Sequence, residues 1–337
     1  MPYDVSVIIP TFNRAAYIAT ALDSVIGQTI LSEGARIEAA IVDDGSTDDT
    51  AQVVAPYLER YADGHGPLRL TYTRLEKQGV VTARNTALAR TNAPLVAFLD
   101  SDDYWAPAKL EKQIVILARD ESVGVVHTSF LYVNQDGFIT GQGGEGGERP
   151  DNPVVGRCLR PLLGEDLVIF SSVLIRREVI NAAARAETHG LPFDPRWTNA
   201  QDYDLLLRAA RLTGYAYLAQ PLTFYRLHDA HGAMGNLPRA FGFHARVQMD
   251  FTRRWGKETA ITEDEGRAQA REFLLGRARG QFWQRHLETA RQLCALAEEL
   301  GLTDERFAKL ARQTARPLWL YRIKDTVDRL LGKGSRS

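Results

Sequence analysis

Residues 95–103 read LVAFLDSDD, so five apolar residues run directly into three carboxylates within four positions. A short, continuous apolar run is typical of a strand that is covered on both faces, as in a parallel sheet. Carboxylates this close repel one another unless a cation or hydrogen-bond donors offset their charge. Mg²⁺ is often held by one or two carboxylates together with phosphate oxygens. The alternative is a turn and a helix N-terminus before Pro107, which Asp residues also favour.

The sequence on either side of this stretch alternates between strand and helix patterns. Apolar runs predict strands over residues 5–9, 37–42, 68–73, 95–99 and 123–130. Helical spacing predicts helices over 13–28, 80–90 and 109–119, with another opened by an N-cap at 46–49. Such alternation implies a mainly parallel sheet with right-handed crossovers, whose ligands bind at the carboxyl ends of the strands. Polar residues follow the first, second and fourth strands.

The second half of the chain has a different pattern. Residues 141–153 are rich in glycine and lack periodicity, which predicts a flexible loop. Strand patterns follow at 168–175 and 215–218, and helical patterns at 177–187 and 202–212. From Pro238 onward the pattern is almost wholly helical. We therefore predict a catalytic α/β domain over 1–237 and a helical extension over 238–337.

Composition excludes several classes of protein. The hydrophobic fraction of 45% and the charged fraction of 25% are those of a globular chain. A net charge of −1 argues against a nucleic-acid binder. Two distant cysteines favour a reducing compartment over a disulfide framework. No signal peptide and no membrane-spanning run is apparent, so we expect a cytoplasmic protein.

Four further polar features carry chemistry, each with a simpler alternative. Asp43 and Asp44 could accept hydrogen bonds from a base or a ribose, or could begin a helix. Arg84, in the first turns of a predicted helix, suits an anionic partner because the helix dipole disfavours a cation there; the simpler alternative is a solvated arginine. Asp202 opens an apolar helix and could be an N-cap and nothing more. His228 could bind a metal or a phosphate, or lie on the surface; no zinc ligand set accompanies it.

The order and spacing of these motifs resemble family 2 glycosyltransferases of the GT-A fold. The resemblance is carried by VSVIIPTFNR (5–14), VDDGSTD (42–48), ARN (83–85) and FLDSDD (98–103), and it extends over roughly 4–230. It implies a Rossmann-like mixed sheet flanked by helices and transfer of a sugar from a nucleotide diphosphate, with inversion. Its implied donor-binding residues are Pro10, Thr11, Phe12, Arg14, Asp43, Asp44, Arg84, Asp100, Ser101 and Asp102.

The resemblance also implies individual roles. Asp44 would contact the base, most often uracil, and Asp102 would coordinate Mn²⁺ or Mg²⁺ with Asp100 and His228 close to the metal or diphosphate. Asp202 matches the Asp of the family's Glu-Asp motif, the general base, although Gln201 replaces the usual Glu. The implied partners are a UDP-linked sugar and a saccharide or lipid-linked acceptor of cell-surface polysaccharide or glycolipid synthesis.

The chemistry of these residue types agrees with that implication. A divalent cation offsets charge on the leaving diphosphate. A positioned carboxylate can take the proton of the attacking hydroxyl. One base without a covalent nucleophile gives a single displacement, hence inversion. The rival functions are a nucleotidyltransferase, an Asp-dependent phosphatase and a non-catalytic scaffold.

The C-terminal segment is basic and amphipathic. From Arg306 to the end there are nine Lys or Arg residues and two Asp residues. Apolar residues in 317–331 can share one helical face, which favours either peripheral contact with an anionic membrane, at the inner face of the cell membrane, or docking on the protein itself. The sequence neither predicts nor excludes a homodimer.

Overall fold

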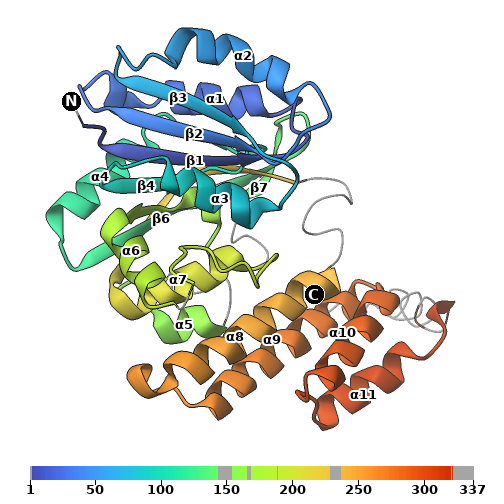
Figure 1. The fold of residues 1–337 in the computed structure, drawn as a ribbon. Helices are drawn as coiled ribbons and strands as arrows, with labels where there is room; N and C mark the ends of the chain where they lie inside the picture. Colours follow the sequence, from blue (N-terminus) through green and yellow to red (C-terminus); the bar gives the residue numbers. More distant parts are fainter. Residues whose placement is uncertain are drawn as a thin grey trace. The chain divides into compact units, whose positions relative to one another are not determined.

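The computed structural model describes residues 2–142, 154–164, 168–187, 189–227, 237–319 and 321 (Figure 1). Clustering of contacts divides the chain into two units, residues 1–230 and 231–337. The boundary therefore falls among 228–236, which lie outside the described ranges and adjoin the predicted boundary at 237/238. The two units are described separately below.

The first unit is built on a mixed sheet. Its strands are β1 (Val5–Thr11), β2 (Ile37–Asp43), β3 (Leu68–Arg74), β4 (Leu95–Phe98), β5 (Tyr104–Trp105), β6 (Val123–Val133), β7 (Ile139–Gln142), β8 (Leu174–Arg176) and β9 (Gly214–Arg226). The strand order is β3-β2-β1-β4-β8-β6-β9-β5, and β7 pairs with β6. Strands β1 to β4 run parallel, whereas β8 lies antiparallel between β4 and β6. The expected mixed sheet is confirmed.

Helices cover both faces of this sheet (Figure 1). They are α1 (Ile18–Ile26), α2 (Thr50–Tyr61), α3 (Val80–Ala89), α4 (Lys109–Arg119), α5 (Leu159–Gly164), α6 (Arg177–Arg185) and α7 (Gln201–Leu212), with short 3₁₀ turns at Thr29–Leu31 and Phe170–Ser172. Strands β1 and β2 are buried at every position, because α1 and α2 pack on one face and α3 on the other. This explains their continuous apolar runs.

Several predicted boundaries were wrong. Helix α1 begins at Ile18 rather than at Asn13, whose φ of 51° is left-handed. Helix α2 begins directly after the predicted cap at 46–49, with Asp49 in the cap position, but no side chain caps it and its first turn has no acidic residue. The Ser46 hydroxyl donates to Asp43 instead.

The later elements also differ from prediction. Only the last two residues of the predicted strand 168–175 lie in a strand, as the start of β8 (Leu174–Arg176), since 170–172 forms a 3₁₀ turn. The short strand expected at 215–218 is part of the 13-residue β9, which continues to Arg226. Gly141 and Gln142 end β7 rather than open a loop, and the rest of the predicted loop, 143–153, lies outside the described residues.

The second unit is helical, as expected for this part of the chain. Its helices are α8 (Leu237–Thr259), α9 (Glu263–Trp283), α10 (Leu287–Glu299) and α11 (Glu305–Thr314). Thr262 and Glu265 form a capping box at the start of α9, and Asp304 caps α11. Successive helices run antiparallel around a core that includes Leu274, Leu293 and Phe307. Within the described ranges, no helix combines the length and the apolar content needed to cross a bilayer.

Candidate active site

The carboxyl ends of β1, β2 and β4 meet at one edge of the sheet. The parallel register places Thr11 beside Asp43 and Ile8 beside Phe98, two residues before Asp100. The loops that leave these strands are joined by backbone bonds, including one from the Asp44 amide to the Thr11 carbonyl at 2.9 Å. Residues from stretches 11–14, 43–48 and 100–103 are thereby brought to a single edge, where ligands bind in such sheets.

The loop after β1 is fixed by the loop after β2. The Asn13 amide donates to the Ser46 hydroxyl at 2.9 Å, and the Asn13 side chain accepts from the Thr47 amide at 2.8 Å. These bonds hold Asn13 in its left-handed conformation, which costs roughly 1–3 kcal/mol and is typical of functional sites. Gly45, with φ 82°, is required here because a Cβ would lie 3.2 Å from the Lys77 backbone nitrogen.

The two aspartates of the second motif differ in their surroundings. Asp43 is fully buried and accepts hydrogen bonds from the amide and hydroxyl of Ser46 and from the Tyr72 hydroxyl. Asp44 accepts from the amides of Gln78 and Gly79 at 2.6 to 3.0 Å, at the start of α3. Asp43 therefore fixes the turn, whereas Asp44 fixes the loop that leads into α3.

The acidic turn after β4 is held by residues that the sequence analysis missed. The Asp103 carboxylate accepts from the Ser171 hydroxyl at 2.6 Å and from the Arg226 amide at 2.9 Å. The Arg226 guanidinium donates to the carbonyl oxygens of Asp102, Asn134 and Gln135 at 2.8 to 2.9 Å. Strand β9 and the 3₁₀ turn at 170–172 thus determine how Asp100 and Asp102 are presented.

Two arginines join the motifs to one another. Arg14 donates through Nε to Asp102 Oδ2 at 3.1 Å. Arg84 donates to Asp100 Oδ1 at 2.7 Å, and its Nη1 lies 4.0 Å from Asp202 Oδ2. The open cluster, defined as Asp100, Asp102 and Asp202, is therefore one site. The exposed fractions of these three side chains are 37%, 18% and 31%, so a ligand can reach them.

Asp202 reaches this site because α3 is clamped to the segment that precedes α7. The Asn85 side chain donates to the Phe193 carbonyl at 2.8 Å and accepts from the Phe193 amide at 3.0 Å. The Phe170 and Phe193 rings lie 4.8 and 5.6 Å from the Arg84 guanidinium, which is only 3% exposed. Ala200, just before α7, has a left-handed φ of 60°. Strain at the entry to α7 is another mark of a functional site.

The open cluster fits a hard divalent cation. Burial, together with the negative charges of Asp102 and Asp100, raises the pKa of Asp103 well above its usual value. Burial and the same carboxylates also raise the pKa of Tyr225. Burial is the larger cause of both shifts, and the neighbouring carboxylates add to it. Partly exposed carboxylate oxygens are the donor set that Mg²⁺ and Mn²⁺ prefer, and a cation would replace or join Arg14 and Arg84 as the partner of Asp102 and Asp100.

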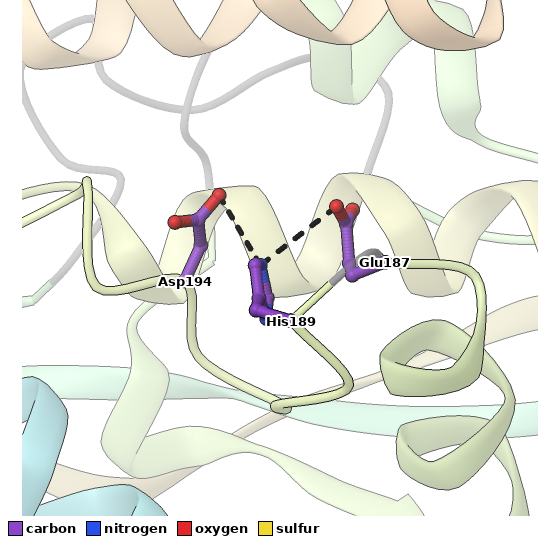
Figure 2. Close-up of side chains that lie close together, drawn as sticks. All are labelled: Glu187, His189 and Asp194. Atoms are coloured by element: carbon purple, nitrogen blue, oxygen red, sulfur yellow. Dashed lines mark ion pairs between the residues drawn. The ribbon is translucent and has the colours of Figure 1, made fainter.

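A second acidic group in this unit consists of Glu187, His189 and Asp194, whose potential ligand atoms lie within 4.8 Å of one another (Figure 2). His189 Nε2 is 3.8 Å from Glu187 and 3.5 Å from Asp194. However, His189 Nδ1 accepts from the Leu191 amide at 3.0 Å, so Nε2 carries the proton of the neutral ring. A protonated nitrogen cannot ligate a metal, which favours an ion-pair cluster over a cation site.

Arginines complete this ion-pair cluster. Arg196 makes a two-pronged contact with Asp194, and Arg208 donates to Asp204 at 2.7 Å with its Nε 3.5 Å from Glu187. We call Glu187, Asp194 and Asp204 the closed cluster, because their side chains are only 5%, 1% and 0% exposed. The closed cluster joins the segment 187–196 to α7 and so supports the position of Asp202.

Most of the predicted site residues lie at this sheet edge. The Phe12 ring lies 4.3 Å from the Lys77 ammonium group, and the buried Thr11 hydroxyl has no hydrogen-bond partner among the described residues. Pro10 is within β1, and Ser101 is buried in the acidic turn. His228 lies outside the described residues. Lys77, Ser171 and Arg226 were missed because nothing in their local sequence marks them.

Comparison with known proteins agrees with this geometry. The family model described as "Glycosyl transferase family 2" matches residues 6–181. An amylovoran biosynthesis glycosyltransferase of Erwinia amylovora is 30% identical over 239 residues, which cover 68% of this chain and 71% of the relative. An uncharacterized glycosyltransferase of Nostoc sp. is 31% identical, over 68% of this chain and 66% of that protein. The matched part of the chain spans only 22% of a Pasteurella multocida chondroitin synthase, at 26% identity.

Solved structures share the fold. S. aureus TarS in complex with UDP-GlcNAc has a TM-score of 0.62 and 20% identity, covering 96% of this chain and 88% of that one. A mannosyltransferase of Pyrobaculum calidifontis, in complex with GDP-Man and Mn²⁺, has a TM-score of 0.57 and 21% identity, covering 99% of this chain and 89% of that one. These likenesses show the GT-A fold.

Proposed function

The chain belongs to glycosyltransferase family 2, and on that premise we propose that it transfers a sugar from a UDP-linked donor to an acceptor hydroxyl with inversion at the anomeric carbon. The observation that carries the proposal is the position of Arg84 between Asp100 and Asp202. Arg84 thereby places the Asp202 carboxylate, which is suited to act as the base, next to the acidic turn after β4, which is suited to bind a cation. The relatives in polysaccharide synthesis support a saccharide or lipid-linked acceptor.

The donor would lie along the edge formed by β1, β2 and β4. Asp44 would contact the base at the start of α3; this residue is 6% exposed, so the base would have to replace one of its bonds from the Gln78 and Gly79 amides. Phe12 with Lys77 forms an aromatic and cationic surface. Asp102 and Asp100 would hold Mn²⁺ or Mg²⁺, which supplies positive charge against the departing diphosphate. Arg14 contributes further positive charge beside Asp102.

Asp202 would serve as the general base. It removes the proton from the acceptor hydroxyl as that oxygen bonds to the anomeric carbon, while the bond from this carbon to the diphosphate oxygen breaks. A single displacement from the face opposite the leaving group inverts the configuration. Arg84 lies beside Asp202, with Nη1 4.0 Å from Oδ2, and helps to hold the carboxylate in position.

A panel of UDP-, GDP- and dTDP-sugars, incubated with the protein and Mn²⁺, tests the proposal. We expect one UDP-sugar to be turned over with release of UDP, and EDTA to abolish the reaction. Release of pyrophosphate would instead indicate a nucleotidyltransferase. Turnover of no donor in the presence of Mn²⁺, with no thermal stabilisation by any nucleotide, would indicate a non-catalytic protein. NMR of the transferred product should show the anomeric configuration opposite to that of the donor.

A further inference from the structure

The helical unit has one basic and one acidic end. Because successive helices are antiparallel, the start of α8, the end of α9, the start of α10 and the end of α11 lie together. Contacts between Arg277 and the Phe241 ring and between Arg291 and the Thr314 carbonyl confirm this arrangement. The arginines that gather there are Arg239, Arg279, Arg285, Arg312 and Arg316. Most carboxylates gather at the other end, together with Lys257, Arg267 and Arg306, whereas Glu288 lies at the basic end; the carboxylates are Glu263, Asp264, Glu265, Glu298, Glu299 and Glu305.

Helix dipoles account for only part of this polarity. Acidic first turns begin α9 and α11, and α11 has a basic last turn, as the dipole rule predicts. The same rule fits Lys257 in the last turn of α8 and Glu288 in the first turn of α10. However, α10 ends in Glu298 and Glu299, and Arg239 lies in the first turn of α8, which opposes the dipole. The excess of arginines at the basic end therefore points to an anionic partner.

Two large aromatic side chains are exposed at the same end. Trp283, in the last turn of α9, is 62% exposed, and Trp319, which follows α11, is 58% exposed. The Arg285 guanidinium lies 5.9 Å from the Trp283 ring and 5.2 Å from the Tyr321 ring, and Tyr321 packs on Phe282. Exposed tryptophans among arginines suit a membrane interface, where the ring enters the headgroup region and the cation meets lipid phosphates.

We infer that this end of the helical unit is a docking surface for an anionic lipid bilayer. The basic surface consists of Arg279, Arg285, Arg312 and Arg316 with Trp283 and Trp319. The chain continues from it: residues 322–337 contain five Lys or Arg and two Asp residues, so their sequence adds net positive charge. A bilayer accounts for both the positive charge and the exposed rings, because a Trp ring enters the headgroup region while an arginine meets lipid phosphates. Single-stranded nucleic acid, which also stacks on rings among basic side chains, is the alternative that the experiment below separates. The inference does not depend on the proposed transfer reaction.

Co-sedimentation of the full chain with lipid vesicles tests whether the basic surface binds an anionic bilayer. We expect binding to vesicles that contain phosphatidylglycerol, weakened by salt, and little binding to phosphatidylcholine alone. The triple substitution R279E/R312E/R316E should lower the partition coefficient by at least about tenfold. R69E/R119E/R185E makes the same charge change at exposed positions of the first unit and should leave binding nearly unchanged.

Depth of insertion provides a second readout. Brominated lipids in the anionic vesicles should quench tryptophan fluorescence of the wild type, and W283F/W319F should lose most of that quenching. The melting temperature of each variant must match that of the wild type. The inference is overturned if the wild-type protein does not bind anionic vesicles, whether or not it binds single-stranded DNA. It is also overturned if the two triple variants lose vesicle binding equally.

Discussion

The open and closed clusters use the same residue types, yet the structure places them in different environments. In both, carboxylates lie beside arginines: Arg14 and Arg84 in the open cluster, Arg196 and Arg208 in the closed cluster. The exposed fractions of the carboxylate side chains are 18% to 37% in the first and 0% to 5% in the second. Pairing with arginine alone therefore does not identify a binding site. Access to solvent decides which carboxylates can exchange an internal partner for a ligand.

The largest effect is expected from Asp202→Asn in the open cluster. The amide keeps the shape of the side chain but cannot accept the proton of the acceptor, so transfer should fall by about 10²–10⁴ in kcat. Donor affinity, measured by titration with the nucleotide sugar and Mn²⁺, should stay within about threefold of wild type. Full transfer activity in this variant would exclude Asp202 as the base.

In the closed cluster, Asp204→Ala should act on stability instead. It leaves the buried Arg208 without its closest carboxylate, which typically costs about 3–5 kcal/mol. Urea unfolding measures this change. The matched control is Asp102→Ala, whose partner Arg14 is 30% exposed and which should cost less than about 1 kcal/mol. Similar losses in both variants would contradict the distinction between the clusters.

Acid sensitivity of the fold should come partly from His127, which belongs to neither cluster. Burial lowers the pKa of His127 from 6.5 to about 4, although its bond to the Val154 carbonyl opposes the shift. The unfolded chain thus binds the proton more tightly, and stability should fall by up to about 3 kcal/mol as pH drops from 6.5 toward 4. In His127→Gln this part of the pH dependence should vanish. Identical pH profiles for both proteins would refute the assignment.

The smallest effect is expected from His189→Gln. Because its Nδ1 accepts a backbone hydrogen bond, Nε2 is not available to a metal, and Mn²⁺-dependent nucleotide affinity should stay within about twofold of wild type. Isothermal titration measures this directly. A loss of tenfold or more would show that the Glu187–His189–Asp194 group binds the cation after all.

Much of the first half of the fold could be predicted from the sequence, because its determinants are local. The apolar runs of β1, β2 and β4 and the carboxylates that follow them predict both the parallel strands and the edge where their side chains gather. The start of α1 could not be predicted. It depends on bonds from Asn13 and Arg14 to groups more than 30 residues away.

The remaining site residues depend on contacts that are distant in sequence. Asp103 is held by Ser171 and Arg226, 68 and 123 positions further along the chain. Asp202 is placed through the Asn85–Phe193 clamp, which spans 108 positions. Local patterns carry no signal for such pairings. The motif order indicated that these residues belong together, whereas only the fold shows which side chains support them.

Titration of UDP into wild type and Asp102→Asn, each with Mn²⁺ and with EDTA, tests the central claim most directly. If the open cluster binds the cation that holds the diphosphate, Mn²⁺ should strengthen binding to the wild type by at least about tenfold and should have almost no effect on the variant. An equal effect of Mn²⁺ on both proteins would mean that the cation binds elsewhere, and the proposed site would have to be abandoned.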